Sequence, residues 1–494
     1  MKETIRLSKI NEVFFKAHLN REQYLELREF FSHYAQDYKF QPKYKAGMWD
    51  GKICFLDKFG QFPIGLFHRF VEFCDKYGYD IGIDFDEKSF VNHISDAFLS
   101  KFFENLFPPE KNIYPRDYQQ EAVKKAITSG RGVLNLATSS GKSLIIYCLL
   151  RYLIAMNKNV IVIVPNISLV EQLFSDFKND YGWDNAINSV CLNYGGKEID
   201  FQKRILLTTW QSVYKNDEHF FERYEGIIID EAHSMTGKSI QSIASKCKNA
   251  FFRIGLTGTM PKNDAEMYTI VGYLGQVIHK IMSIELIEKG VISKIKIRNL
   301  ILNYPQQMRY ARTNYQAEVD DINSYKNRNK AINYILDKVD PEENVLILVT
   351  KIEHLLTVKK YIEDNYPKKN VYEIYGNTEG EIREEIRKSL EKESGAVLVA
   401  SYGTFSTGSN VKKLHHIVLF SSYKSQIKVL QSIGRGLRKH ESKEFVTVWD
   451  CCDNLQYTDG RKIYKNWTYL HWEKNRLSYY EEQQFEYSDE KLDI

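Results

Sequence analysis

Three short groups of residues, far apart in the chain, have the residue types that bind and hydrolyse a nucleoside triphosphate. They read Ala137-Thr138-Ser139-Ser140-Gly141-Lys142-Ser143, Asp230-Glu231-Ala232-His233 and Gln431-Ser432-Ile433-Gly434-Arg435-Gly436-Leu437-Arg438. The first two suit one triphosphate site. The third adds two arginines at an i, i+3 spacing, which predicts that both lie near one helical face. Such separation is typical of an enzyme that closes around ATP, so we expect a motor ATPase.

The first group has the composition of a phosphate-binding loop. Backbone N–H groups between a strand and a helix can point at phosphate oxygens, Lys142 adds a positive charge, and the Ser143 hydroxyl can bind Mg²⁺. Leu136 stands where the strict form of the motif has its first glycine. Gly-Lys-Ser alone is a common chance match, but here it follows an apolar run and begins a helical pattern. We therefore expect residues 138–143 to bind ATP.

The second group follows Gly226-Ile227-Ile228-Ile229, a run that predicts a buried strand. At the end of such a strand Asp230 can hold Mg²⁺ through water, and Glu231 can polarise the attacking water. The alternative is an acidic pair that only stabilises the start of a helix. Its position after a phosphate loop favours the catalytic interpretation.

The third group offers Arg435 and Arg438, whose guanidinium groups can each bind phosphate oxygens in a fork. Arginines that reach the nucleotide only on domain closure make hydrolysis depend on that closure. The alternative is a basic surface helix, because Lys439 and His440 continue the charge.

Composition limits the class of protein. The 494 residues predict about three domains, and 43% hydrophobic with 27% charged residues indicates a globular chain. The net charge is only +4, so any polyanion must be bound by local patches. The seven cysteines include no C-x-x-C pair, which predicts a reducing, cytoplasmic location. No apolar run approaches the roughly 18 residues of a membrane span.

Apolar runs and helical patterns alternate along most of the chain. Residues 119–127 predict a helix, and short apolar runs at 133–136, 160–164, 345–349, 396–400 and 416–420 predict buried parallel strands. Prolines near residue 110 mark a boundary. We expect an α/β protein with a small α+β domain at 1–108, two tandem doubly wound parallel-sheet domains at 109–290 and 291–455, and a C-terminal helical extension at 456–494.

The order of these groups resembles superfamily 2 helicases and translocases over about residues 111–450. It also includes Arg116-x-Tyr118-Gln119 and Thr257-Gly258-Thr259, while Ser401 and Thr407-Gly408-Ser409-Asn410 resemble the family's motif V, with Asn410 in place of the usual aspartate. The resemblance implies two RecA-like motor domains. It implies that Gln119 recognises adenine, that Gln431 acts with the arginines in hydrolysis, and that Thr257, Thr259, Ser401, Thr407 and Gly408 couple the nucleotide site to nucleic acid.

Finer details resemble the DNA recombination and repair branch of that superfamily. RNA helicases have Ser-Ala-Thr where this chain has Thr257-Gly258-Thr259, and residues 47–52, 62–66 and 401–408 are similar to phage helicases of the UvsW type. This resemblance implies an ATP- and Mg²⁺-dependent enzyme that unwinds and branch-migrates forks, Holliday junctions, displacement loops and RNA–DNA hybrid loops in phage recombination, repair and replication. It further implies a monomer with recombination or single-strand-binding proteins as partners. The alternatives are a restriction-complex motor subunit and an ATP-switched nucleic-acid-binding protein.

Two further regions leave alternatives open. Residues 38–58 interleave lysines with aromatic rings, and we expect DNA contacts from Lys43, Lys45, Trp49 and Lys52; the alternative is a small domain with core aromatics and solvated lysines. The aromatic tail after residue 455 predicts helices packed on the second motor domain, or a site for a partner protein. The pair His415-His416 lacks neighbours at metal-ligand spacing, so we expect a structural role for it.

Overall fold

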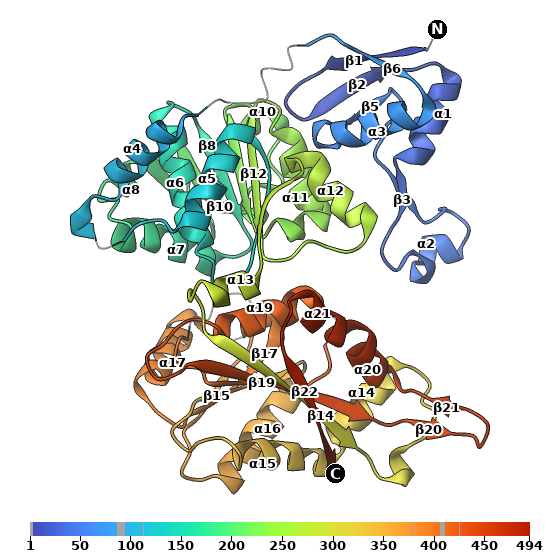
Figure 1. Ribbon diagram of the computed structural model, residues 1–494, viewed down its shortest axis with the longest axis vertical. Coiled ribbons are helices and arrows are strands. Elements are labelled where there is room, and N and C mark those ends of the chain that lie inside the picture. The colour runs from blue at the N-terminus through green and yellow to red at the C-terminus, as the bar shows by residue number, and fades with distance from the viewer. Residues whose placement is uncertain (1–2, 86–93, 112, 377, 406–410, 424) are drawn as a thin grey trace. The chain divides into compact units, whose positions relative to one another are not determined.

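The computed structural model describes residues 3–85, 94–111, 113–376, 378–405, 411–423 and 425–494. The chain forms two compact units, one of residues 1–136 and 141–281, the other of residues 137–140 and 282–494. Figure 1 labels the elements of both. This two-unit grouping joins the N-terminal region to the first parallel sheet. The expected division into four parts, with boundaries near residues 108, 290 and 455, stays a prediction.

A four-stranded mixed sheet forms the N-terminal region, with the order β5-β2-β1-β6. Alternation along β1 and β2 places Ile5, Leu7, Phe15 and Ala17 on one buried face, which helices α1 and α3 complete with further apolar residues. The elements are β1 (Thr4–Lys9), β2 (Phe14–His18), α1 (Arg21–Phe30), β3 (Ser32–Tyr34), α2 (Pro42–Lys45), β4 (Lys52–Cys54), β5 (Gln61–Pro63), α3 (Phe67–Tyr77), β6 (Asp80–Ile83) and α4 (Asp96–Leu106).

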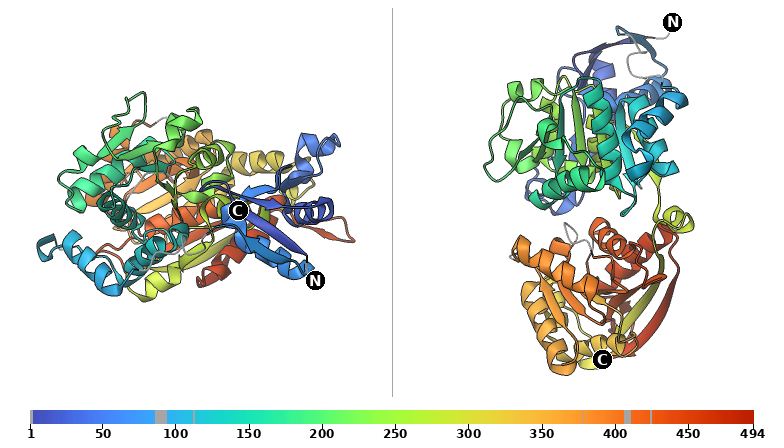
Figure 2. Two further views of the ribbon diagram at one scale, coloured as in Figure 1. Left: turned by 90° about the horizontal axis from the view of Figure 1, so that it is seen from above. Right: turned by 90° about the vertical axis from the view of Figure 1, so that its left-hand side faces the viewer.

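The first seven-stranded sheet is parallel throughout, in the order β13-β7-β12-β11-β8-β10-β9. Its central strands are buried along their whole length, as expected for a sheet with helices on both faces, which Figure 2 shows. The strands are β7 (Arg131–Leu136), β8 (Val160–Val164), β9 (Val190–Asn193), β10 (Ile205–Thr209), β11 (Gly226–Asp230), β12 (Phe252–Thr257) and β13 (Val277–Ile281).

One helix, α5, precedes the first strand of this sheet, and the others lie between successive strands. They are α5 (Asp117–Ser129), α6 (Lys142–Ala155), α7 (Ile167–Ser175), α8 (Ala186–Ser189), α9 (Trp210–Val213), α10 (Glu218–Glu222), α11 (Lys238–Lys246) and α12 (Asp264–Leu274). The predicted helix at 119–127 and the predicted strands at 133–136 and 160–164 are therefore confirmed.

The N-terminal region packs directly on α12. Val271 of α12 belongs to the same buried cluster as Ile5 and Phe15, and Tyr268 packs against that cluster. A β-carbon on Gly65 would lie 1.8 Å from the Val271 carbonyl oxygen, so only glycine permits this close approach. The N-terminal region and the first parallel sheet thus share a core, and removal of residues 1–108 would expose the apolar face of α12.

The second seven-stranded sheet is also parallel, in the order β16-β17-β15-β18-β19-β14-β22. Two tandem doubly wound parallel sheets with a small α+β N-terminal region confirm the predicted fold class. The strands are β14 (Lys294–Asn303), β15 (Val345–Val349), β16 (Val371–Ile374), β17 (Val397–Ser401), β18 (His416–Leu419), β19 (Phe445–Asn454) and β22 (Tyr487–Asp493). The helices are α13 (Ser283–Glu288), α14 (Tyr315–Ser324), α15 (Lys330–Leu336), α16 (Ile352–Asn365), α17 (Gly380–Lys392), α18 (Tyr402–Phe405), α19 (Gln426–Gly436), α20 (Trp467–His471) and α21 (Leu477–Glu482).

The C-terminal tail differs from the helical extension that the sequence predicts. Besides α20 and α21 it contains an antiparallel pair, β20 (Tyr457–Thr458) and β21 (Ile463–Tyr464), and then β22, which pairs in parallel with β14 from Ile297 to Asn303. The tail contains helices, α20 and α21, but the prediction missed β22, because β22 is an edge strand with mostly exposed, charged side chains. Such a strand has no apolar run to reveal it.

Buried carboxylates fasten this tail to the second sheet. Asp450 on β19 forms an ion pair with Arg476 and accepts a hydrogen bond from the Tyr480 hydroxyl at 2.8 Å. Glu318 of α14 accepts bonds from the backbone N–H groups of Trp467 and Thr468 at 3.0 and 2.7 Å. These contacts join the tail to the core of the second unit.

We predict that Arg476→Met lowers the free energy of unfolding of the second unit by about 3–5 kcal/mol, because it leaves the Asp450 carboxylate buried without its cation. Denaturant titration followed by tryptophan fluorescence measures this change. Lys465→Met is the matched control, since Lys465 pairs with Glu473 in the same tail but in solvent, and it should leave unfolding nearly unchanged. Equal effects of the two substitutions would contradict the anchoring role.

Candidate active site

Three neighbouring strands of the first sheet end where the predicted catalytic groups begin. Strand β7 leads into the loop before α6, β11 ends at Asp230, and β12 ends at Thr257. Because β7, β12 and β11 are adjacent and parallel, their carboxyl ends meet at one edge of the sheet. Topology therefore brings together residues that are far apart in the chain.

The backbone of the phosphate loop has positive φ angles at two residues, Ser139 and Gly141. Gly141 precedes α6 with φ of 82°, and a β-carbon there would lie 2.3 Å from Nε2 of Gln119. Ser139 also has a positive φ, 67°, which is strained for a residue other than glycine. Ser140 is buried, and its N–H donates to the Ala137 carbonyl at 3.2 Å. The loop thus presents the first turn of α6, where backbone N–H groups have no partner within the helix.

Gln119 lies beside this loop and is only 2% exposed. Its Oε1 accepts a hydrogen bond from the Arg116 N–H at 2.9 Å, which fixes the amide at the start of α5. The predicted adenine-binding residue is therefore held in one orientation next to Gly141.

The side chain of Glu231 lies between the lysine of the phosphate loop and His233. Its Oε1 lies 3.6 Å from Nζ of Lys142, and its Oε2 lies 3.3 Å from Nδ1 of His233. Its backbone is left-handed, with φ of 52°, and its N–H donates to Oδ1 of Asp230 at 3.0 Å. Strain at this position aims the carboxylate at the lysine of the loop.

Asp230 is 7% exposed at the end of β11. Burial, and then the negative charge of Glu231, raise the pKa of Asp230 to about 6, while Lys142 acts in the opposite direction. Two adjacent carboxylates beside one lysine leave a site that a cation would stabilise.

A chain of polar contacts runs from Glu231 through His233 to the end of β12. Nδ1 of His233 lies 3.1 Å from Oγ1 of Thr257, and the Thr257 hydroxyl donates to the Thr259 carbonyl at 2.9 Å. Because that hydroxyl has a single proton, it must accept from His233, so Nδ1 of His233 carries a hydrogen. The predicted coupling residues Thr257 and Thr259 are thus linked to the carboxylate of Glu231.

Tyr181 is a site residue that no sequence pattern indicates. Its hydroxyl lies 2.6 Å from Oγ of Ser143, the predicted Mg²⁺ ligand. Burial raises the pKa of Tyr181, so its hydroxyl stays protonated at neutral pH. Tyr181 follows the short helical turn 176–180 and belongs to no motif, so only the fold brings it to the loop.

In the second unit, the two arginines do not share a helix. Gln431 and Arg435 lie in α19, but the helix ends before Arg438, which forms a β-bridge with Ile292. The expectation of one helical face was wrong because tertiary bonds take the last carbonyls: Nζ of Lys443 donates to the Gly436 carbonyl at 2.7 Å, and the Ser293 N–H donates to the Leu437 carbonyl at 2.7 Å.

The remaining predicted residues of this unit have varied surroundings. The hydroxyls of Ser401 and Thr404 lie 2.9 Å apart, and Thr407 and Gly408 lie outside the described residues. Nδ1 of His415 accepts from the Asn344 N–H at 3.0 Å, and Nε2 of His416 lies 2.6 Å from a carboxylate oxygen of Glu343. Both histidines thus take part in hydrogen bonds within the sheet.

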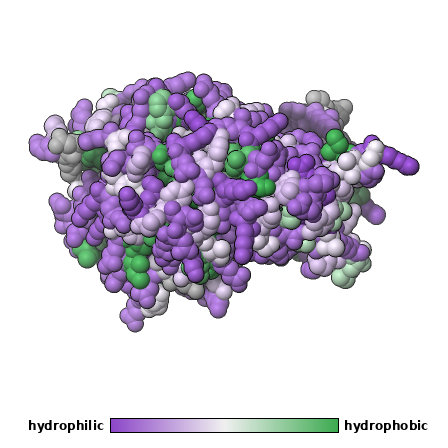
Figure 3. All heavy atoms as spheres, turned by 90° about the horizontal axis from the view of Figure 1, so that it is seen from below, coloured by the Kyte–Doolittle hydropathy of each residue, from purple (hydrophilic) through white to green (hydrophobic). Residues whose placement is uncertain are grey.

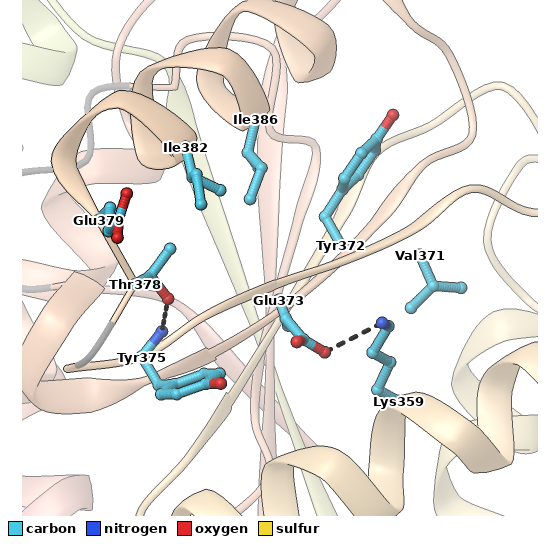
Figure 4. Close-up of a pocket in the computed structure, with 9 residues that line it drawn as sticks. All are labelled: Lys359, Val371, Tyr372, Glu373, Tyr375, Thr378, Glu379, Ile382 and Ile386. Atoms are coloured by element: carbon cyan, nitrogen blue, oxygen red, sulfur yellow. Dashed lines mark hydrogen bonds and ion pairs between the residues drawn. The ribbon is translucent and has the colours of Figure 1, made fainter.

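A hollow of 390 Å³ in the second unit lies between α16, β16 and α17. Figure 4 shows Lys359 and Glu373 paired in it, with Nζ and Oε2 3.0 Å apart. None of the predicted site residues lines this hollow, so it belongs to another part of the fold.

The N-terminal basic residues fall into two kinds. Lys43 and Lys45 lie exposed on α2. Lys52, in contrast, forms an ion pair with Glu29, and the Trp49 indole N–H donates to the Lys52 carbonyl at 2.8 Å. Trp49 and Lys52 therefore hold the local backbone together.

The surface in Figure 3 is mainly hydrophilic, with small separate hydrophobic patches. Over the part of the chain that the structure describes, no helix combines the length and the apolar character needed to cross a membrane.

Known proteins resemble this chain over most of its length. Family models match for the N-terminal region of the DNA helicase UvsW at residues 11–84, the res subunit of type III restriction enzymes at 112–262, and the conserved C-terminal helicase domain at 327–440. The ATP-dependent DNA helicase uvsW of Enterobacteria phage T4 is 35% identical over 459 residues, 90% of each chain. The DNA 3'-5' translocase XPB2 of Sulfurisphaera tokodaii is 26% identical over 66% of this chain and 79% of its own.

Solved structures give the same result. The crystal structure of T4 UvsW matches with a TM-score of 0.53 and 31% identity over 100% of both chains. A fragment of a putative HsdR subunit from Vibrio vulnificus matches with a TM-score of 0.60 over 87% of this chain and 74% of its own, but at 17% identity this likeness concerns the fold alone. This chain belongs to the UvsW family and is an ATP-dependent DNA helicase.

Proposed function

We propose that this helicase uses ATP hydrolysis to unwind and branch-migrate branched nucleic acids: forks, Holliday junctions, displacement loops and RNA–DNA hybrid loops. The observation that carries the proposal is the chain of contacts from Lys142 through Glu231 and His233 to Thr257. It joins the phosphate loop to the end of β12, which is followed by α12, the helix on which the N-terminal region packs. The match of residues 11–84 to the UvsW N-terminal region favours this function over that of a restriction motor subunit.

Each group of the site has a proposed role. Residues 138–143 bind the triphosphate with their N–H groups, and Lys142 binds phosphate oxygens. Glu231, held between Lys142 and His233, orients and polarises the attacking water. Gln119 binds adenine. Gln431, Arg435 and Arg438 of the second unit act on the phosphates, and Ser401, Thr407 and Gly408 act in nucleic-acid coupling.

Magnesium suits the oxygen donors at this site. Asp230 is a buried carboxylate at the end of β11 with Glu231 next to it, and the Ser143 hydroxyl stands in the first turn of α6, directly after the phosphate loop. We propose that Asp230, through water, and Ser143 hold the ion. When bound, Mg²⁺ would neutralise phosphate charge.

The first test separates nucleotide binding from hydrolysis. We expect Lys142→Ala to lose most nucleotide affinity, and Glu231→Gln to bind ATP normally but to turn over roughly 10²- to 10⁴-fold more slowly, the usual contribution of a general base. A fluorescent ATP analogue and phosphate release measure the two steps.

Glu225 provides a matched control for Glu231. It precedes β11 as Glu231 follows it, and it pairs with Lys158 at 2.7 Å, so Glu225→Gln removes a similar ion pair away from the loop. Glu225→Gln should hydrolyse ATP at the parent rate. A parent rate in Glu231→Gln would remove Glu231 from the role of base.

The second test concerns pH. Because the pKa of Asp230 is raised to about 6 without a cation, Asp230 is protonated below that pH and ionised above it. Magnesium binding requires the ionised form, so at low Mg²⁺ we expect kcat/KM for ATP to fall as pH decreases through about 6. Saturating Mg²⁺ competes with the proton and should move the fall to lower pH. One midpoint at both Mg²⁺ concentrations would contradict the assignment.

The third test concerns coupling. Thr257→Val removes the hydroxyl bonded to His233 and Thr259, so we expect a stability loss of about 1–3 kcal/mol and a loss of DNA-stimulated, but not basal, ATP hydrolysis. Thr208→Val is the control, because Thr208 is equally buried and its hydroxyl donates to the Asn193 carbonyl at 2.8 Å in the same sheet. It should lose stability and keep the stimulation. Loss of stimulation in both would indicate a general packing defect.

A further inference from the structure

A small projection on the N-terminal region, here called the tyrosine lobe, consists of residues 32–54. Strands β3 and β4 form its antiparallel stem, and α2 lies at its far end, away from the four-stranded sheet (Figure 1). Tyr34 and Tyr38 stack with ring centroids 4.5 Å apart, and Tyr44 meets Tyr38 edge-on at 4.9 Å. A β-carbon on Gly51 would lie 2.3 Å from the Tyr38 ring, so the stack is closely fitted to the backbone. The tyrosines thus form the scaffold of the lobe.

Two apolar side chains on this lobe remain in solvent. Phe40 is 74% exposed and Met48 is 73% exposed, the highest fractions among the large hydrophobic side chains of the described residues. They flank α2 in the chain, one on each side. Single exposed apolar residues are ordinary, but the two most exposed ones on one short projection indicate a contact surface.

The charge around these two residues suits a polyanion. Lys39, Lys43 and Lys45 are exposed on the same segment. The lobe has two acidic residues against these three lysines: Asp37, which is exposed, and Asp50, which accepts from the Lys52 N–H at 2.9 Å. Lys52 itself pairs with Glu29. Lysines for phosphates beside an apolar ring are the usual means of binding unpaired nucleotides.

The stem of the lobe is fastened to the start of α12. Nδ2 of Asn263 donates to the Tyr34 carbonyl at 3.1 Å, and the rings of His33 and Tyr268 lie 4.6 Å apart. Oδ1 of Asn263 also accepts from the Glu266 N–H, which caps α12. Since α12 follows Thr259 closely in the chain, a base held by the lobe would keep a defined place relative to the ATPase strands of the first unit.

We propose that Phe40 and Met48 pack against unpaired bases next to a DNA branch point, while Lys39, Lys43 and Lys45 bind the adjacent phosphates. Base faces inside a duplex are covered by their neighbours, and only an unpaired or branch-point base offers a free face for a ring. The lobe therefore distinguishes a branched substrate from a linear duplex. This inference rests on the proposed function and assigns the branch recognition to these two side chains.

The test uses the full-length protein without nucleotide. A forked DNA has 2-aminopurine at the first unpaired position, and binding is measured on this fork and on a linear duplex of equal length. Phe40→Ala should weaken fork binding by roughly tenfold, the effect of losing one stacked base, and should abolish the fluorescence change of 2-aminopurine. Met48→Ala should act in the same direction. Linear-duplex binding should not change.

Three variants serve as controls. Phe40→Trp keeps a stacking ring and should retain fork binding. Phe201→Ala removes a phenylalanine that is 53% exposed outside the lobe and should have no effect. The double variant Lys43→Gln, Lys45→Gln should weaken fork and duplex alike and reduce the salt dependence by up to about two phosphate contacts.

The outcomes separate this inference from the proposed function. Unchanged fork binding in Phe40→Ala, or equal weakening on fork and duplex, would overturn the inference, even where the parent protein unwinds forks with ATP. Failure of the parent protein to unwind any branched substrate would instead overturn the proposed function. Selective loss on the fork, with basal ATP hydrolysis intact, supports the inference.

Discussion

The position of Glu231 is the constraint on which the rest of the site depends. Its carboxylate lies against Lys142 on one side and His233 on the other, and its backbone is held in a left-handed conformation to make this possible. Through His233 the contact continues to Thr257 on the neighbouring strand. A change at the phosphate loop, such as the arrival of ATP phosphates at Lys142, would therefore alter the contacts of Glu231, whose neighbour His233 is hydrogen-bonded to Thr257 at the end of β12.

The segment after β12 carries this link toward the N-terminal region. Thr257 bonds to Thr259, Asn263 caps α12 and bonds to Tyr34, and Val271 of the same helix lies in the N-terminal core. The close approach at Gly65 excludes a side chain between the two layers. The N-terminal region, which precedes the motor motifs in the chain, thus packs on α12, the helix that follows Thr257-Gly258-Thr259. It belongs to the same folded unit as the first parallel sheet.

Much of this fold is predictable from sequence, and the exceptions share a physical cause. Strands such as Val160–Val164 and Val345–Val349 are fully buried in parallel sheets, so their apolar runs indicate them directly. Strand β22 is a polar edge strand, Tyr181 reaches Ser143 only through the fold, and α19 ends where Lys443 and Ser293 bond its carbonyls. Apolar runs in the sequence therefore predict strands that are buried along their length. Tertiary hydrogen bonds determine the other three features, and no local pattern indicates them.

In the tyrosine lobe, too, sequence alone does not show which single side chains face the solvent. In sequence, its rings and lysines form one undivided patch. In the structure, the rings of Tyr34, Tyr38 and Tyr44 pack against one another. The Trp49 indole donates to a backbone carbonyl, and Lys52 forms an ion pair with Glu29. Composition cannot say which rings are used internally, because each stacked tyrosine is chemically able to stack on a base. Only the packing leaves Phe40 and Met48 in solvent, and exposure therefore selects the side chains that can meet a substrate.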